Sequence, residues 1–305
     1  MTSPFKTVLI TGATGFLGRH CVEKFINENF KVITTDKAIG ADLTGDLCDP
    51  EFVRSLPTVD IIVNCAAVQY VTKKKPLLRR EAFFLNNSIS SNLLSKRYIS
   101  NTHFIHIGSS MMYRMSDKDL IETDQLKGNG IYSNSKCDAQ VHIENIPFSA
   151  TVIPCIIGGR GREGLFKAFV KMIAFLPFVI VPGDGTKPIH MVHVKDVAEL
   201  IVLIAKKRTS GIFNAASLDP LSINAWIMVM ATQLKKKPPK VIHLPIKPIR
   251  ILSLMTGYRL LAEEQILMLK NRHVLCITKS REIGWEPIYT NAEIAQEITT
   301  HIIQG

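Results

Sequence analysis

This sequence of 305 residues lacks both closely spaced pairs of cysteines and long apolar segments. No run of about 20 uninterrupted apolar residues exists, which argues against a membrane span. The first residues read as a strand rather than a signal peptide. The six cysteines show no C-x-x-C pair and no metal-ligand spacing; they are Cys21, Cys48, Cys65, Cys137, Cys155 and Cys276. This pattern suits reduced thiols, so we expect a cytoplasmic protein without a metal site.

Acidic residues are also in the minority, with 26 Asp and Glu against 37 Lys and Arg and a net charge of +11. The basic residues cluster at 73–75, 79–80, 206–208 and 235–237. Aromatic residues do not interleave with these clusters, so we expect no nucleic-acid partner. A solvated basic surface is the first interpretation, and attraction to an acidic membrane surface or an anionic substrate is the second.

What the sequence does contain is a glycine-rich turn at residues 11–18, Thr-Gly-Ala-Thr-Gly-Phe-Leu-Gly, directly after an apolar run. Gly12 allows the tight bend, Gly15 lets the backbone approach a pyrophosphate, and Gly18 lets the helix pack closely on the sheet. The phosphates would bind the free N–H groups at the start of a helix near Phe16. The turn therefore predicts a dinucleotide site, and a glycine-rich turn without a ligand is the alternative.

The first half of the chain alternates short apolar runs with helical patterns, as βαβ units do. Strands are expected at 7–11, 31–35, 61–65, 104–108 and 151–157, and helices at 16–28, 81–100 and 132–145. The pattern predicts an α/β fold, a doubly wound parallel sheet of the Rossmann type, with its ligand at the carboxyl ends of the strands.

After about Gly158 the pattern becomes more helical. Helical stretches are expected at 164–178 and at 249–270, and Pro177 lies near the end of the first. Between them we expect a strand end plus helix at 192–205 and a basic, proline-rich segment at 235–248. We expect a dinucleotide-binding domain at 1–158 and a smaller, mostly helical substrate lobe at 159–305. Segments near 189–216 would return to the Rossmann core.

Asp36 ends the second expected strand, about 20 residues beyond the glycine turn. A carboxylate there accepts hydrogen bonds from the adenosine ribose hydroxyls and repels a 2′-phosphate. This favours NAD over NADP, although Lys37 lies next to it. A solvated strand end is the alternative interpretation of Asp36.

A second motif, Tyr-Ser-Asn-Ser-Lys, occupies residues 132–136. The spacing places Tyr132 and Lys136 on one helix face, where the ammonium can help to lower the pKa of the phenol. Tyr132 could then take a proton from a substrate hydroxyl while hydride leaves for the cofactor. Ser109, at the end of the strand 104–108, could orient the reacting oxygen, although a helix N-cap is the alternative for Ser109 and equally for Ser110.

With these residues the chain resembles the extended short-chain dehydrogenases/reductases of the NAD-dependent epimerase/dehydratase and 3β-hydroxysteroid dehydrogenase type. Further resembling segments are Asp46-Leu47, residues 64–67, Asn86, Ser109 four residues before Tyr113, residues 192–198, Phe213-Asn214 and residues 280–287. The resemblance implies that Ser109, Tyr132 and Lys136 are catalytic. It implies a cofactor site made of Gly12, Gly15, Phe16, Leu17, Asp36, Asp46, Leu47, Cys65, Ala66, Ala67, Asn86, Tyr132, Lys136 and Pro154. It also implies a homodimer through helices 81–100 and 132–145.

The departures from the family pattern concern the substrate. Nucleotide-sugar members usually carry an arginine where this chain has Ile189, and often an asparagine where it has Cys155. Losing a charged phosphate clamp removes a charge-assisted contact, so we favour NAD-dependent oxidation or reduction of a lipophilic or other non-nucleotide alcohol or ketone.

Two alternatives stay open. In a nucleotide-sugar epimerase or dehydratase, Lys187, Arg160 or Arg162 would clamp the phosphate from another direction. A protein of another class would bind NAD without turnover, as a sensor or assembly protein. Peripheral membrane contact through the basic, apolar C-terminal lobe is a further hypothesis. The histidines at 103, 106, 190 and 193 lie in strand-like apolar segments and are interpreted as core or surface residues.

Overall fold

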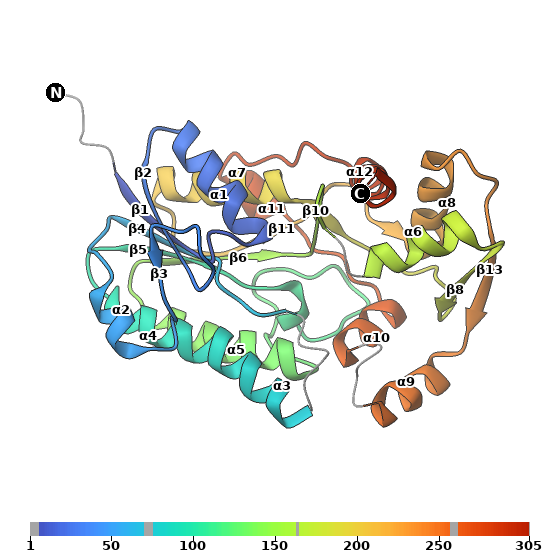
Figure 1. Cartoon of the computed structure of the whole chain (residues 1–305), viewed down its shortest axis with the longest axis horizontal. Helices are drawn as coiled ribbons and strands as arrows, with labels where there is room; N and C mark the ends of the chain where they lie inside the picture. Colours follow the sequence, from blue (N-terminus) through green and yellow to red (C-terminus); the bar gives the residue numbers. More distant parts are fainter. Residues whose placement is uncertain (1–5, 70–75, 163–164, 257–261, 305) are drawn as a thin grey trace.

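A seven-stranded parallel sheet forms the centre of the molecule, in the order β11-β6-β5-β4-β1-β2-β3 (Figure 1). The computed structural model describes residues 6–69, 76–162, 165–256 and 262–304. The strands are β1 (Thr7–Thr11), β2 (Lys31–Asp36), β3 (Leu43–Thr44), β4 (Ile61–Asn64), β5 (His103–Ile107), β6 (Ser149–Pro154) and β11 (Gly211–Ala215). The central residues of β1, β4, β5 and β6 are buried on both faces, as in a parallel sheet that is covered on both sides.

Helices cover both faces of this sheet. Figure 1 shows α1 (Phe16–Asn27) and α7 (Val194–Lys207) on one face, and α2 (Pro50–Ser55), α4 (Ser90–Arg97) and α5 (Ile131–Glu144) on the other. On α1, Leu17, Cys21 and Phe25 recur every four residues and turn one buried stripe toward the sheet. The expected doubly wound parallel sheet is confirmed.

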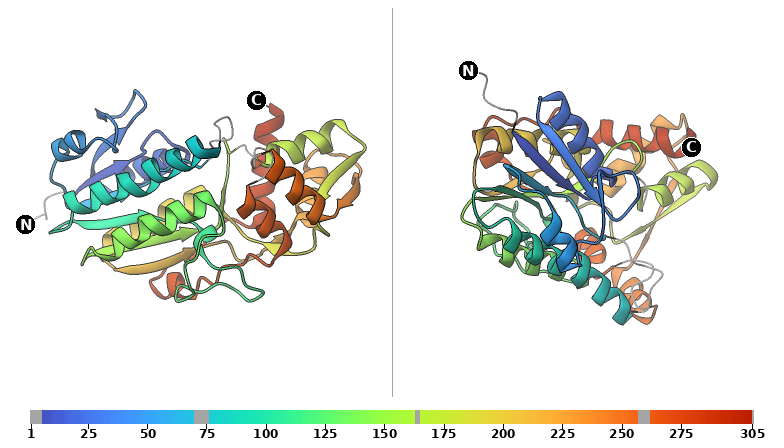
Figure 2. Two further views of the ribbon diagram at one scale, coloured as in Figure 1. Left: turned by 90° about the horizontal axis from the view of Figure 1, so that it is seen from below. Right: turned by 60° about the vertical axis from the view of Figure 1, so that its left-hand side comes forward.

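The second lobe is smaller and mostly helical, as expected, and it lies beyond one end of the sheet (Figure 2). Its helices are α6 (Leu165–Phe175), α8 (Ile223–Gln233), α9 (Ile246–Met255), α10 (Glu263–Lys270) and α12 (Asn291–Gln304). Three two-stranded sheets join them: β7 (Ile156–Gly158) with β10 (Met191–His193), β9 (Pro188–Ile189) with β12 (Leu221–Ser222), and β8 (Phe178–Pro182) with β13 (Lys240–Leu244). A short helix, α11 (Thr278–Glu282), packs near β11.

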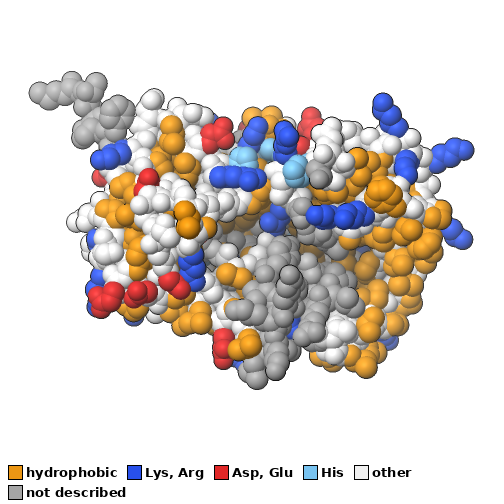
Figure 3. Space-filling model, viewed as in Figure 1, with side chains coloured by type: hydrophobic (Ala, Val, Ile, Leu, Met, Phe, Trp, Pro, Cys, Tyr) orange, Lys and Arg blue, Asp and Glu red, His pale blue; other side chains and the backbone are white. Residues whose placement is uncertain are grey.

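The lobe has its own apolar core, built around Trp226, Phe166 and Ile294. The end of the lobe that holds β8, β13 and α9 also exposes apolar side chains (Figure 3). Within the described residues, no helix combines the length and apolar character that spanning a bilayer requires.

Several expected boundaries were wrong. The single strand at 151–157 is two strands, because the chain leaves the main sheet after Pro154 and β7 pairs with β10 instead. The single helix at 81–100 is α3 (Pro76–Phe83), a π-helical segment η1 (Phe84–Ile89) and α4. The helix at 164–178 ends at Phe175, because Pro177 follows and Phe178 already belongs to β8.

The basic segment at 235–248 contains β13, and the helical stretch at 249–270 is divided into α9 and α10. The five residues of β13, Lys-Val-Ile-His-Leu, are too few to distinguish a strand from a loop or helix by periodicity. The expected basic cluster at 73–75, and residues 163–164 and 257–261 of the expected helices, lie outside the described residues.

Candidate functional site

One cleft of about 410 Å³ brings together every residue that the sequence analysis assigned to a site. It lies where the carboxyl ends of the parallel strands face the second lobe. From the expected cofactor site, its lining includes Gly12, Gly15, Phe16, Leu17, Asp36, Asp46, Leu47, Cys65, Ala66, Ala67, Asn86 and Pro154. Ser109, Tyr132 and Lys136 line the same cleft. Residues that are up to 142 positions apart in the chain, from Gly12 to Pro154, therefore share one space.

The glycine turn has room for backbone but not for side chains. A Cβ on Gly12, whose φ is +61°, would lie 2.7 Å from Cα of Ala66, and one on Gly18 would lie 2.0 Å from the carbonyl oxygen of Gly12. Gly15 precedes α1 without a side-chain cap, so the first N–H groups of this helix remain for an anion. These residues fit the pyrophosphate of a dinucleotide.

Asp36 is held in place by Thr14. Its Oδ2 accepts hydrogen bonds from the backbone N and the Oγ1 of Thr14, at 3.0 and 2.7 Å. Burial raises the pKa of Asp36, but these hydrogen bonds outweigh it, and the pKa lies below its ordinary value. The carboxyl group is therefore ionised at neutral pH.

Lys37 does not oppose this carboxylate directly. Its Nζ donates to Oδ1 of Asn86 at 2.8 Å and lies 2.9 Å from Oδ1 of Asp46. The ammonium thus joins two of the expected cofactor residues, Asn86 and Asp46, at one end of the cleft. Nothing in the local sequence indicates this link, since 49 positions separate Lys37 from Asn86.

Lys136 is 2% exposed, and its Nζ donates to the carbonyl oxygen of Ile107 at 2.8 Å. Burial lowers the pKa of this ammonium to about 8. Tyr132 lies one turn earlier on α5, with its ring edge-on to Phe83 at 5.8 Å between centroids. Both side chains line the cleft, as the four-residue spacing predicts.

Ser109 and Ser110 have different surroundings. Ser109 Oγ accepts a hydrogen bond from the N–H of Met111 at 3.3 Å and caps the short 3₁₀ helix η2 (Ser110–Met112). Accepting this bond uses a lone pair, so the hydroxyl hydrogen can still be donated into the cleft. Ser110 is 2% exposed, and its Oγ lies 2.7 Å from Nε2 of His273. The capping and substrate-orienting interpretations of Ser109 are therefore compatible.

The half of the cleft nearest the second lobe is mostly apolar, and the sequence analysis named none of its residues as site residues. Its lining includes Met111, Ile156, Ile157, Phe166, Ile223, Trp226, Gln265, Met268 and Leu269. Among the described residues, Nε1 of Trp226 is buried without a hydrogen-bond partner. The apolar sequence of a helix such as α8 predicts that it packs in a core. That Trp226 lines the cleft follows only from the position of α8 in the folded protein.

Of the three residues considered as phosphate clamps, Arg162 lines the cleft. Its guanidinium donates to Oε1 of Gln69 at 2.6 Å and lies over the ring of Phe16 at 5.5 Å. Ile189 is fully buried in the lobe core, so the position at which we noted a missing arginine does not face the cleft in this chain.

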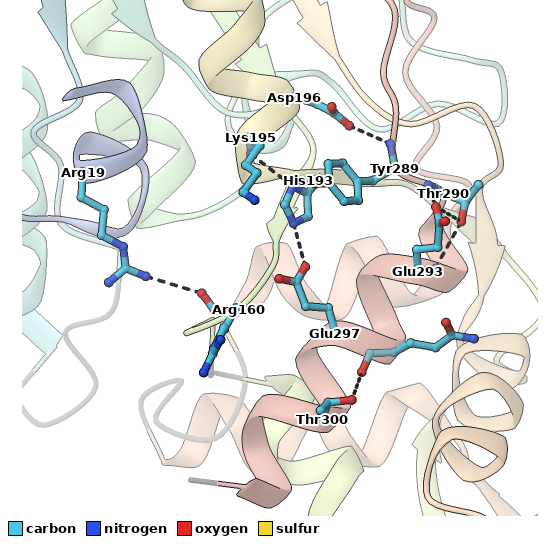
Figure 4. Close-up of polar contacts among 11 residues, drawn as sticks. Arg19, Arg160, His193, Lys195, Asp196, Tyr289, Thr290, Glu293, Glu297 and Thr300 are labelled. Carbon is cyan, nitrogen blue, oxygen red and sulfur yellow. Dashed lines mark hydrogen bonds and ion pairs between the residues drawn. The ribbon is translucent and has the colours of Figure 1, made fainter. Parts of the chain in front are cut away.

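Figure 4 shows a group of polar contacts that includes Arg19, Arg160, His193 and Glu297. Arg19 donates to the carbonyl oxygen of Arg160 at 3.5 Å. His193, 1% exposed, stacks on Tyr289 at 3.7 Å, and its Nε2 lies 2.7 Å from Oε2 of Glu297. These contacts make His193 a packing residue. No group of His, Cys, Asp and Glu side chains within the described part of the chain could hold a metal ion.

The second lobe also contacts the start of α5 through Glu264. This carboxyl group is buried, and its Oε1 accepts hydrogen bonds from N and Oγ of Ser133 at 3.0 and 3.1 Å. A Cβ on Gly130 would lie 2.2 Å from the carboxyl carbon, so the glycine makes space for it. A carboxylate at this end of a helix complements the helix dipole. Glu264 therefore ties α10, which lines the apolar half of the cleft, to the helix that carries Tyr132 and Lys136.

We expect Glu264→Ala to lower the free energy of unfolding by about 1–3 kcal/mol, because it leaves the buried N–H of Ser133 without its acceptor. Glu264→Gln keeps an acceptor oxygen and should lose less. Urea denaturation measures both, with the exposed Glu282→Ala as the control, expected within about 0.5 kcal/mol of wild type. Equal stability of Glu264→Ala and wild type would contradict this role.

A model of the NAD dependent epimerase/dehydratase family matches residues 8–216 of the chain. Human dTDP-D-glucose 4,6-dehydratase is 22% identical over 254 residues, which cover 72% of this chain and 71% of that protein. The beta subunit of rat methionine adenosyltransferase 2 is 26% identical over 216 residues, which cover 67% of this chain and 64% of the subunit.

The fold is shared with MoeE5, solved in complex with UDP-glucuronic acid and NAD. The TM-score is 0.79 at 18% identity, and the match covers 98% of this chain and 99% of MoeE5.

Proposed function

The chain belongs to the NAD-dependent epimerase/dehydratase family, and we propose that it transfers hydride reversibly at a secondary alcohol carbon of a nucleotide-linked sugar. The observation that carries this proposal is that Ser109, Tyr132 and Lys136 line one cleft together with the glycine turn and Asp36. The chain is thus an enzyme of the short-chain dehydrogenase/reductase type with the residues for acid–base chemistry beside those for a dinucleotide.

We assign Tyr132 as the acid/base. A bound nicotinamide dinucleotide supplies the hydride acceptor and donor. In the oxidative direction Tyr132 takes the hydroxyl proton, the C–H bond breaks with its electron pair leaving as hydride, and a C=O bond forms. Lowering a phenol pKa by three units requires roughly 4 kcal/mol of differential stabilisation. The Lys136 ammonium, one helical turn away, is placed to contribute to it.

Ser109 is proposed to hold the reacting oxygen by donating its hydroxyl hydrogen. If the ketone stays bound and hydride returns to its other face, the same three residues perform an epimerisation. Release of the ketone instead gives a net dehydrogenase. The arrangement of Ser109, Tyr132 and Lys136 serves both outcomes, so the fate of the hydride has to be measured.

We propose NAD rather than NADP as the cofactor. Gly12, Gly15, Phe16 and Leu17 would hold the pyrophosphate, and the ionised Asp36 would accept the ribose hydroxyls and repel a 2′-phosphate. Lys37, the neighbouring cation, is already engaged by Asn86 and neutralised by Asp46.

The nucleotide-linked sugar is now the better supported substrate class. The human relative is named for a dTDP-sugar, and MoeE5 was solved with a UDP-sugar. Arg162 supplies a guanidinium on the cleft wall for a diphosphate. The lipophilic substrate favoured by the sequence remains a second candidate, because Met111, Phe166 and Trp226 give the substrate half an apolar lining.

A non-catalytic role is the third candidate, since one relative is a subunit of methionine adenosyltransferase 2. The presence of Ser109, Tyr132 and Lys136 in one cleft favours turnover over binding alone. A homodimer through α3, η1, α4 and α5 is also proposed. It is supported by Leu85, Ile89 and Val141, which are 44%, 42% and 57% exposed on this helical layer.

The testing experiment offers UDP-glucose, dTDP-glucose and a steroid alcohol, each with NAD and with NADP. NADH absorbance and the stereochemistry of the product by NMR are recorded. We expect turnover of a nucleotide sugar with NAD, and a substrate deuterated at the reacting carbon should show whether the hydride is kept. Turnover of the steroid alone would favour the second candidate, and saturable NAD binding without any turnover the third.

A further inference from the structure

One end of the second lobe carries an apolar surface that the hydride-transfer site does not use. We call it the lobe-end face and define it by Ile180 of β8, Ile242 and Leu244 of β13, and Ile251, Leu254 and Met255 of α9. These side chains are between 36% and 79% exposed. Figure 3 shows orange side chains gathered over this end of the molecule.

The two strands present these residues on one side. In the parallel pair of β8 and β13, Ile180 lies opposite Ile242, and Leu244 follows two positions later. Side chains two positions apart share a face of a strand. The opposite face carries Val179 and Val181, which are fully buried in the lobe core. Ile180, Ile242 and Leu244 therefore do not contribute to the packing of the lobe core.

Helix α9 continues the surface directly after β13. Its inner side is formed by Ser253, which is buried, and by the partly buried Ile246 and Ile249. Ile251, Leu254 and Met255 point elsewhere and are 60%, 62% and 79% exposed. At about 1.5 Å per residue this ten-residue helix is roughly 15 Å long, far too short to cross a bilayer but long enough to lie in its surface.

Basic residues outnumber acidic ones around this face, although Asp184 follows β8 and Glu263 forms an ion pair with Arg250. Residues 220–262 contain no Asp or Glu at all. The same stretch carries exposed basic residues at Lys235, Lys236, Lys237, Lys240, Lys247 and Arg250. An apolar surface bordered by lysines is complementary to an anionic lipid headgroup layer over an acyl interior.

We propose that the lobe-end face binds the surface of an anionic lipid bilayer, with Leu254 and Met255 entering the acyl boundary and Lys235 and Lys237 contacting headgroups. A second copy of this chain is disfavoured, because an isologous contact would bring identical basic clusters together. A protein partner is disfavoured because lysine is depleted at protein interfaces, and five of the six basic residues here are lysines. The proposal does not depend on the substrate or on turnover.

Co-sedimentation of the full chain with vesicles tests the proposal. We expect binding to phosphatidylcholine vesicles that contain 30 mol% phosphatidylglycerol, weakened by high salt, and no binding to pure phosphatidylcholine. Each lysine near an anionic surface contributes about five-fold to the partition coefficient, so Lys235→Gln with Lys237→Gln should lower it by about 25-fold. Leu254→Gln with Met255→Gln should lower it by at least about ten-fold.

Matched controls lie in the Rossmann domain. Lys96→Gln with Lys118→Gln removes two exposed charges, and Ile39→Gln removes a side chain that is 95% exposed. These variants should bind as wild type does, and circular dichroism should show that all variants are folded. The proposal is overturned if anionic vesicles do not sediment the protein, or if the controls lose as much binding as the lobe-end variants. Self-association that depends on Leu254 and Met255, without vesicle binding, would assign the face to a second copy instead.

Discussion

Tyr132→Phe is expected to lower kcat by about 10²- to 10⁴-fold, the range in which a positioned acid or base contributes to a rate. The substitution removes the oxygen that would exchange the proton and keeps the ring that packs edge-on against Phe83. NAD affinity should hardly change, because the glycine turn and Asp36 lie on other elements. Steady-state kinetics gives kcat, and fluorescence titration gives the dissociation constant of NAD.

Tyr113 offers a matched control for this experiment. It is also a buried tyrosine, but its hydroxyl donates to Oδ1 of Asn214 at 2.8 Å and is not part of the cleft lining. Tyr113→Phe should therefore cost about 1 kcal/mol of stability and leave kcat near wild type. If Tyr132→Phe kept its turnover, or if both variants lost it equally, the acid/base assignment would be wrong.

The residues that we assign to the cofactor line one cleft, and this could be predicted because its signals are local. Gly12 and Gly18 have no room for a Cβ, so these glycines in the sequence indicate how closely the backbone packs. Tyr132 and Lys136 are one helical turn apart, and the spacing alone places them together. Asp36 ends a strand whose position follows from the parallel order of the sheet. Each of these inferences needs only residues that are close in the sequence and the expectation that βαβ units form a parallel sheet with its ligand at the carboxyl ends of the strands.

The substrate half could not be predicted in the same way. Trp226 lies on α8, Phe166 on α6 and Met268 on α10, and only the packing of these three helices brings them to one wall. Their apolar character is what a core helix requires, so it does not mark a ligand contact. Glu264 is similar: its partner Ser133 lies 131 positions earlier, and nothing in the local sequence connects them.

The boundaries that were wrong share a physical cause. At Cys155 the chain changes partners, since β6 pairs with β11 and β7 with β10, although the apolar run continues through both strands. The strand β13 pairs with β8, but in the sequence it follows a run of three lysines and is flanked by prolines, which hides it. The bounds of these strands depend on partner strands that are distant in the sequence. The periodicity of apolar residues does not indicate which strands pair.

The other large effect is expected from Lys136→Met. A nearby charge shifts a pKa by about one to three units, so removing this ammonium should lower kcat/KM at pH 7 by about 10- to 1,000-fold if it lowers the pKa of Tyr132. The loss should shrink as the pH rises, because a phenol of higher pKa ionises at higher pH. A pH–rate profile of wild type and variant measures this. Profiles of identical shape would show that Lys136 does not act through the phenol.

The same substitution should raise stability at neutral pH. Burial lowers the pKa of Lys136 from 10.5 to about 8, so between these values the unfolded chain holds a proton that the folded chain has lost. The free energy of unfolding therefore rises with pH between about 8 and 10.5. Below pH 8 the desolvated ammonium lowers it by a constant amount of about 3 kcal/mol. Methionine removes the penalty and also removes the bond to the carbonyl oxygen of Ile107, worth about 1 kcal/mol.

Lys136→Met should consequently be more stable than wild type by about 2 kcal/mol at pH 7 and less stable above about pH 10. Urea denaturation at pH 7 and pH 10 checks the reversal, with the exposed Lys96→Met as a control that should show none. A difference that does not depend on pH would mean that the ammonium is not desolvated in the folded protein. The Lys136 ammonium would thus lower the stability of the protein while it supports turnover. This combination is expected at a site that ionises a phenol, because a cation lowers the pKa of the phenol most where water does not screen its charge.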